Sequence, residues 1–173
     1  MRYLEIRRHT DNDGDTLTAD GIMTAEAVGR TGLHPPYAVF ASTGAARANQ
    51  TVEILRHAAG QDDEPVLALP ALRSSVEDRW KAASKAAGRG ADLEAIREVD
   101  PDLVDSETRL LGQALGQVLD ALPEEGRALV VGHSPTNEAA VLGLTGRLVA
   151  PLDTGDGVLI TQTRDGFEVG RLD

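Results

Sequence analysis

Short apolar runs alternate with longer amphipathic segments along most of the chain. The apolar runs predict strands at residues 3–6, 37–40, 66–69 and 128–131. Apolar residues at helical spacing predict helices from near Thr18, at about 45–59, from Asp105 or Ser106 to before Pro123, and at 136–144. Strands that alternate with helices in this way predict an α/β fold, a three-layer αβα sandwich with a mainly parallel sheet.

Two regions depart from this alternation. Residues 158–163 and 167–172 flank the turn sequence Arg-Asp-Gly, which predicts a C-terminal antiparallel hairpin at one edge of the sheet. Residues 74–99 are rich in alanine and interrupted by Gly88 and Gly90, which predicts a helical insertion of two short helices with a flexible joint. Because 173 residues suffice for one closed core, we expect a single domain over residues 1–173.

Composition excludes several classes of function. The net charge of -11 and an aromatic content of 3% disfavour a nucleic-acid binder, because phosphate backbones attract basic surfaces. The chain has no cysteine, which rules out disulfides and thiolate chemistry. No apolar run approaches the roughly 20 residues of a membrane span. We therefore expect a soluble cytoplasmic protein without a nucleic-acid or membrane partner; the composition leaves the oligomeric state open.

Candidate chemistry gathers directly after the predicted strands. The three segments concerned are Arg7-Arg8-His9-Thr10, Ser42-Thr43-Gly44-Ala45-Ala46-Arg47 and Gly132-His133-Ser134-Pro135. Because ligands of open α/β sheets bind beyond the carboxyl ends of the strands, we expect these segments to converge on one crevice. Ser134 as N-cap and Pro135 at the first helical position would place His133 at the positive end of a helix. Arginine forks and histidines around one anion fit a phosphoryl group, which a histidine can attack.

The chain resembles the histidine phosphatase (phosphoglycerate mutase-like) superfamily in several ordered motifs. These are Arg8-His9-Thr10, Leu17-Thr18-Ala19-Asp20-Gly21, the segment from Ser42 to Thr51 with its Arg-Ala-Asn-Gln-Thr core, and Val131-Gly132-His133. The resemblance implies a metal-independent phosphatase without cofactor that forms a phosphohistidine intermediate. It implies that His9 is the nucleophile and that His133 stabilises the transition state. Arg8, Arg47, His133 and Thr10 would bind the phosphoryl group.

The proton donor is less well defined by the sequence. The family's general acid follows the third strand, and in that segment Glu77 is our candidate, with Asp78 or no acid at all as alternatives. Gly44 and Ala45 stand where the family has Pro-Leu, which alters the loop before Arg47.

Two charged segments allow structural as well as functional interpretations. The acidic residues from Asp11 to Asp15 suggest a calcium loop, but Thr16 and Ile22 stand where its glycine and its bidentate glutamate belong. We interpret them as a solvated loop beside the pocket that disfavours highly anionic substrates. A basic stretch comprises Arg73, Arg79, Lys81, Lys85 and Arg89. It is either a solvated helix face or a site for a substrate's second anionic group.

The sequence therefore predicts a phosphohydrolase for a phosphomonoester or a phosphohistidine. Its partner would be a small phosphorylated metabolite or a phosphoprotein. A phosphoglycerate-type mutase and a catalytically silent phosphate-binding protein are the alternatives.

Overall fold

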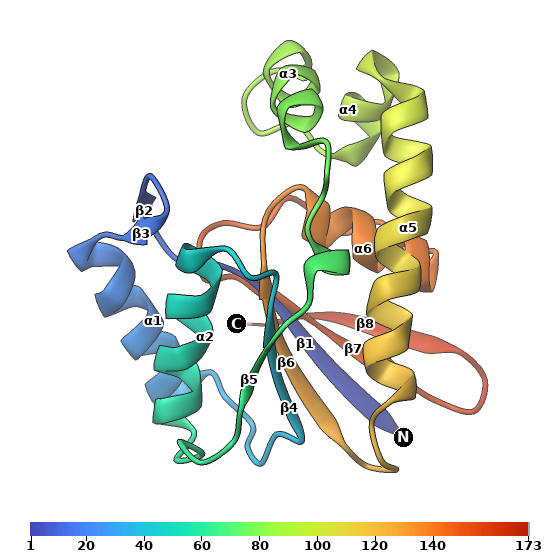
Figure 1. The fold of residues 1–173 in the computed structure, drawn as a ribbon. Helices are drawn as coiled ribbons and strands as arrows, with labels where there is room; N and C mark the ends of the chain where they lie inside the picture. The colour runs from blue at the N-terminus through green and yellow to red at the C-terminus, as the bar shows by residue number, and fades with distance from the viewer. Residues whose placement is uncertain (173) are drawn as a thin grey trace.

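A six-stranded sheet forms the centre of the computed structural model, which describes residues 1–172 (Figure 1). The strands are β1 (Arg2–Arg8), β4 (Val39–Ser42), β5 (Val66–Ala68), β6 (Arg127–Gly132), β7 (Gly157–Gln162) and β8 (Phe167–Leu172). Their order is β5-β4-β6-β1-β7-β8, with the first four parallel and β7 and β8 antiparallel. This sheet and its terminal hairpin confirm the predicted fold class.

Helices cover both faces of the sheet (Figure 1). On one face lie α1 (Ala19–Thr31) and α2 (Ala46–Ala58), with Val52 and Leu55 of α2 packed against Leu129 and Val131 of β6. On the other lie α5 (Pro101–Asp120) and α6 (Thr136–Thr145), whose apolar side chains share one core with Leu4 of β1. Alternate residues of the buried strands therefore face two different helix layers. No helix within residues 1–172 combines the length and apolar character needed to cross a membrane.

Two glycines let α5 and α6 approach each other closely. A Cβ atom on Gly143 of α6 would overlap the backbone oxygen of Thr108 on α5, and one on Gly112 would lie 2.5 Å from the carbonyl carbon of Gly143. Any side chain here would push the helices apart. Because α6 follows directly on the segment of His133, this contact fixes one wall of the candidate site.

The remaining elements lie beyond the carboxyl ends of the parallel strands (Figure 1). They are the small hairpin of β2 (Asn12–Asp13) and β3 (Thr16–Leu17), the short 3-10 helix at Pro70–Leu72, α3 (Glu77–Ala87) and α4 (Leu93–Val99). The two short helices predicted within residues 74–99 are thus confirmed. The buried carboxylate of Glu107 on α5 accepts hydrogen bonds from the Ser74 hydroxyl and from Trp80 Nε1, which anchors α3 to the body of the protein.

One predicted helix start and one predicted cap residue are wrong. The long helix begins at Pro101 rather than at Asp105 or Ser106, because the side chain of Asp100 accepts a hydrogen bond from Leu103 N and proline occupies the first turn. Ser134 is not the N-cap of α6, because Pro135 holds that position and the Ser134 hydroxyl donates to the carboxylate of Glu138.

Candidate active site

His9 follows the last residue of β1 and is only 6% exposed. Its Nδ1 lies 2.8 Å from the carbonyl oxygen of Thr10. Because a carbonyl oxygen can only accept, Nδ1 carries the proton and Nε2 keeps its lone pair. Burial lowers the pKa of His9, and the nearby cations Arg47 and Arg8 lower it further, although the bond to Thr10 acts in the opposite direction. His9 is therefore a neutral imidazole with Nε2 free to act as a nucleophile.

His133 follows β6, and its ring centroid lies 5.2 Å from that of His9. Arg47 Nη2 lies 3.2 Å from Nδ1 of His133, and Thr43 Oγ1 lies 2.8 Å from Nε2. A guanidinium can only donate, so Nδ1 accepts and the proton of the neutral ring lies on Nε2, where it is shared with Thr43. Burial, followed by the charge of Arg47, lowers the pKa of His133 to about 3. The two histidines thus have opposite tautomers.

Arg47 lies in the first turn of α2 and connects His133 to the acidic hairpin. Its Nη1 donates to Asp15 at 2.8 Å, and Asp15 also accepts from the backbone N–H groups of Ala46 and Arg47, each at 3.2 Å. Asp15 therefore caps α2, whose own cap residue, Ala45, makes no side-chain bond. The hydrogen bond from the Arg47 backbone is the main reason that the pKa of Asp15 is lowered.

Arg8 is the last residue of β1 and precedes His9 directly. Its Nη1 donates to the carbonyl oxygen of Leu152 at 2.8 Å, in the loop that leads to β7. Arg8 and Arg47 both lower the pKa of His9, so both cations lie within electrostatic reach of the imidazole. An anion bound at His9 would be attracted by two guanidinium groups held on separate elements.

Thr10 is fixed against α2 through Thr51. Its backbone N–H donates to Thr51 Oγ1 at 3.3 Å, and the two hydroxyl oxygens are 3.5 Å apart. With 1% exposure, the Thr10 residue supports the loop of His9 from within the protein. Its binding to phosphate stays a prediction.

Glu77 begins α3 and is paired with Arg73, with Nε and Oε1 2.6 Å apart. This hydrogen bond is the main cause of the lowered pKa of Glu77, and the charges of Arg73 and Arg47 act in the same direction. Glu77 is therefore ionised at neutral pH. In this arrangement its carboxylate is ready to accept a proton, whereas donating one requires prior protonation.

A cavity of about 320 Å³ lies beside Arg47, His133 and Glu77. It is lined by Arg47, Ser74, Glu77, Trp80, Lys81, Ser84, His133, Ser134, Pro135 and Thr136. The structure thus brings His9, Arg47, His133 and Glu77 to one region, with Arg8 on the wall of the adjoining cavity. Within residues 1–172, no group of three or more histidine, aspartate or glutamate side chains is arranged to hold a metal ion.

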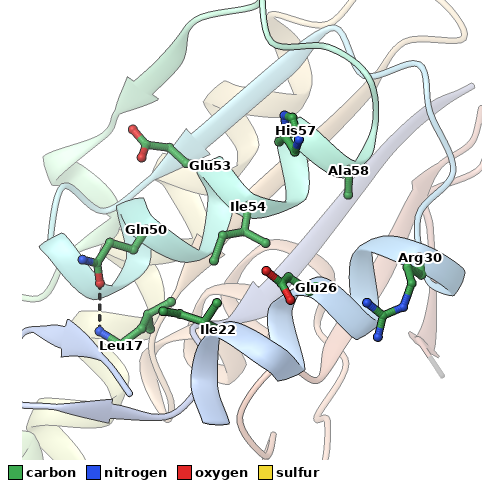
Figure 2. Close-up of a pocket in the computed structure, with 9 residues that line it drawn as sticks. All are labelled: Leu17, Ile22, Glu26, Arg30, Gln50, Glu53, Ile54, His57 and Ala58. Atoms are coloured by element: carbon green, nitrogen blue, oxygen red, sulfur yellow. Dashed lines mark hydrogen bonds between the residues drawn. The ribbon is translucent and has the colours of Figure 1, made fainter. Parts of the chain in front are cut away.

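A separate groove lies between α1 and α2 (Figure 2). Leu17, Ile22 and Ile54 form its apolar part, and Glu26 and Glu53 lie along its sides. Its histidine, His57, has an 81% exposed side chain and pairs with Asp62. None of the groups around His9 lines this groove.

No protein-family model matches the sequence, and no curated protein matches it. Solved structures do match over nearly the full length. Phosphoglycerate mutase from Bacillus anthracis str. Sterne superposes with a TM-score of 0.76 at 17% identity, covering 98% of this chain and 91% of that one. Phosphoserine phosphatase from Entamoeba histolytica, in complex with 3-phosphoglyceric acid, gives 0.73 at 14% identity, covering 100% and 97%. The protein histidine phosphatase SixA, complexed with tungstate, gives 0.59 at 16% identity, covering 99% and 96%.

The chain has the fold that these solved structures share. This confirms the fold that the sequence motifs implied. In this fold, the motif residues His9, Arg47 and His133 lie where the carboxyl ends of β1, β4 and β6 meet, as the topology of a parallel sheet requires.

Sequence reasoning did not predict the contacts of three residues near the site. Thr43 stands at the end of β4 and bonds His133, which the strand-end rule could have shown. Arg73 precedes Glu77 by four residues and pairs with it, but Arg73 lies before α3, so the spacing rule for pairs on one helix does not apply. Asp15 gave no such signal, because its contacts are to residues more than thirty positions away.

Proposed function

We propose that this chain is a phosphohydrolase that acts through a phosphohistidine formed at His9. The observation that carries the proposal is the pair of opposite tautomers: His9 has a free lone pair at Nε2, and His133 has a proton at its own Nε2. A phosphoryl group between the rings would meet a nucleophile on one side and a hydrogen-bond donor on the other. The fold supports this proposal, since its structural neighbours include phosphatases and a mutase.

The reaction proceeds in two displacements. In the first, His9 Nε2 attacks phosphorus, an N–P bond forms, and the P–O bond to the leaving group breaks with its electrons remaining on oxygen, which takes up a proton. In the second, a water oxygen attacks phosphorus, the N–P bond breaks, its electron pair returns to Nε2, and the water gives up a proton. Arg8, Arg47 and His133 bind the phosphoryl oxygens in both steps. The proposed steps use no metal and no organic cofactor.

Glu77 is the group that accepts and donates protons in this scheme. Its carboxylate accepts the proton of the attacking water in the second step, and the acid so formed protonates the leaving oxygen of the next substrate. The ion pair with Arg73 favours the ionised form, so the second step fits the resting structure better than the first. Leaving groups that need little protonation, such as aryl oxides, should therefore be good substrates.

Phosphate release from a generic aryl phosphate tests the proposal. Wild-type protein should release phosphate and form an acid-labile, alkali-stable phosphoenzyme, and His9→Ala should do neither. His57→Ala is the matched control, because His57 is an exposed histidine in the groove between α1 and α2, which none of the groups around His9 lines. Equal rates for wild type and His9→Ala would refute the proposal.

The two alternatives predict different products. A mutase would convert one phosphate isomer into another with little release of inorganic phosphate. A silent phosphate-binding protein would bind phosphate without turnover or phosphoenzyme. The lowered pKa of Glu77 is what favours this second alternative, because an ionised carboxylate cannot protonate a poor leaving group.

A further inference from the structure

Glu138 is a buried carboxylate beside the candidate site that the proposed steps do not use. It lies in the first turn of α6, is 2% exposed and lines the adjoining cavity of about 790 Å³. The Ser134 hydroxyl donates to its Oε1, and Leu152 N donates to the same oxygen at 2.8 Å. One oxygen atom therefore joins the segment of His133 to the loop of residues 147–156, which leads from α6 to β7.

Arg8 is held by this loop through both its backbone and its side chain. Its backbone N–H donates to the carbonyl oxygen of Asp156 at 2.9 Å, and its carbonyl oxygen accepts from Gly155 N at 3.1 Å. Its Nη1 donates to the carbonyl oxygen of Leu152 at 2.8 Å. Within residues 1–172, no carboxylate forms an ion pair with Arg8. The place of the guanidinium group is therefore set by where the loop puts the Leu152 carbonyl.

The 147–156 loop has no regular secondary structure, so side-chain contacts fix its course. The exposed side chain of Arg171 contacts it from β8 at the protein surface. Arg7 donates to the carbonyl oxygen of Gly155 at 3.2 Å near the end of the loop. Leu152, which is 2% exposed, lies between two further contacts: Glu138 accepts from its N–H, and Arg8 donates to its carbonyl oxygen. Glu138 is thus the buried contact nearest to the point where the loop holds Arg8.

The hydrogen bonds of Glu138 matter more here than its charge, because a negative charge near Arg8 opposes the binding of an anion. Burial raises the pKa of Glu138, whereas the bonds from Ser134 and Leu152 and the charge of Arg8 lower it. Both bonds go to Oε1, and Oε2 is buried without a hydrogen-bond partner among the described residues. A neutral side chain with an acceptor oxygen at the place of Oε1 would therefore hold the loop equally well.

We propose that Glu138 is a positioning residue: it fixes Leu152, and through the Leu152 carbonyl it holds the guanidinium group of Arg8 where the phosphoryl group binds. This inference rests on the proposed function, which assigns phosphoryl binding to Arg8. An arginine whose partner is a carbonyl oxygen keeps its full charge for an incoming anion. If the carbonyl moves, the guanidinium moves with it, and binding through aligned N–H groups is sensitive to small displacements. Glu138 itself does not touch the substrate.

Two substitutions that separate the acceptor oxygen of Glu138 from its charge test the proposal. Glu138→Gln keeps an oxygen at the place of Oε1 without the charge, so it should bind inorganic phosphate as tightly as wild type or more tightly. Glu138→Asp keeps the charge but withdraws the oxygens by one methylene group, so it should raise the Kd for phosphate by roughly tenfold. The reverse order, with Glu138→Asp like wild type and Glu138→Gln weakened, would mean that the charge is what matters and would overturn the proposal.

A double-mutant cycle shows whether the effect passes through Arg8. In an Arg8→Gln background, Glu138→Asp should change the Kd for phosphate little further, because the group that it positions is already absent. In an Arg47→Gln background it should keep its roughly tenfold effect, since Arg47 is held by other contacts. Equal effects of Glu138→Asp in the wild-type and Arg8→Gln proteins would overturn the proposal.

Tyr37→Phe is the matched control for a general loss of stability. The buried Tyr37 hydroxyl donates to Glu5 at 2.8 Å, and Tyr37 precedes the amino end of β4, whereas the site lies at the carboxyl ends of the strands. This variant should lower the free energy of unfolding and leave the Kd for phosphate unchanged. A rise in Kd like that of Glu138→Asp would overturn the proposal, because lost stability alone would then account for the effect.

Calorimetry with inorganic phosphate measures this binding without turnover, which separates the proposal from the proposed function. If Glu138 and Arg8 are coupled in a protein that forms no phosphoenzyme, the positioning role is supported and only the proposed function fails. If the protein forms a phosphoenzyme but the two residues are not coupled, only the positioning role is overturned.

Discussion

Replacing Asp15 by asparagine should tighten the binding of inorganic phosphate. The Asp15 carboxylate makes two kinds of contact: it caps α2 through two backbone N–H groups, and it forms an ion pair with Arg47 at 2.8 Å. Asparagine keeps an oxygen for the cap but removes the charge. Arg47 is then no longer shared between an internal carboxylate and the phosphate.

The size of the effect follows from the exposure of the pair. The Asp15 side chain is 54% exposed and that of Arg47 is 19% exposed, so water screens much of the attraction. Pairs of this kind contribute about 0.2–1 kcal/mol, and releasing such a pair should lower the Kd for phosphate by roughly 1.4- to 5-fold. Stability should change little in Asp15→Asn. Asp15→Ala, which also loses the cap, should cost about 0.5–2 kcal/mol.

Competitive inhibition by inorganic phosphate and calorimetry both measure this affinity. Asp62→Asn is the matched control, because Asp62 is an exposed aspartate paired with His57, away from the site. Thermal melting of Asp15→Ala against Asp15→Asn separates the cap from the charge, with about 2–4 °C expected for each kcal/mol in a chain of this size. Weaker phosphate binding in Asp15→Asn would refute the reasoning, since it would mean that Asp15 orients Arg47 for phosphate instead of competing with it.

Four further outcomes are expected. Glu107→Leu leaves the indole N–H of Trp80 without its acceptor, so the free energy of unfolding, measured in urea, should fall by about 1–3 kcal/mol. The KM should rise because α3 is less well anchored, and an unchanged KM would show that α3 needs no such anchor. Gly143→Ala should destabilise by about 1–3 kcal/mol or more, because the added methyl overlaps the backbone of α5; an unaltered melting temperature would contradict the close crossing. Glu77→Gln should slow alkyl phosphates more than aryl phosphates, and equal slowing would argue against proton transfer by Glu77. Stability should decrease as the pH falls below about 6.5, because His133 becomes protonated in the unfolded chain but stays neutral in the folded protein, where its pKa is about 3. The free energy of unfolding should change by at most about 1.4 kcal/mol per pH unit. Urea unfolding of His133→Gln should show a smaller dependence on pH.

The sheet and its helix layers could be predicted from the sequence, because hydrophobic periodicity reports directly on burial. The run from Ala128 to Val131 is buried on both faces and forms the middle of β6, as its continuous apolar character indicated. Helix starts were harder to predict. Asp100 and Pro101 form a start signal that lies outside the apolar pattern, and Ser134 looks like a cap residue but bonds Glu138 instead.

The candidate site shows a similar division. His9, Arg47 and His133 could be placed together because each follows a parallel strand, and such strands end at the same edge of the sheet. The protonation states of the two histidines could not be predicted, because they depend on the carbonyl of Thr10 and on a hydroxyl and a guanidinium that only the folded chain brings within bonding distance. Likewise, the sequence allowed either a solvated helix face or a binding site for the basic stretch from Arg73 to Arg89. In the folded chain Arg73 and Arg79 pair with carboxylates, whereas the other three cations line cavities.

The attachment of α3 through Glu107 has a consequence for how this protein could acquire new substrates. His9, His133, Arg8 and Arg47 belong to the carboxyl ends of the strands and to α2. Lys81, Lys85 and Arg89 belong instead to a segment that begins after the 3-10 helix at Pro70–Leu72 and rejoins the body at α5. Exposed residues of that segment can be exchanged without changing any strand end, provided that Trp80 and Ser74 still reach the carboxylate. Selection or design could therefore change which substrates are recognised by substituting exposed residues of α3, while the groups at the strand ends stay the same.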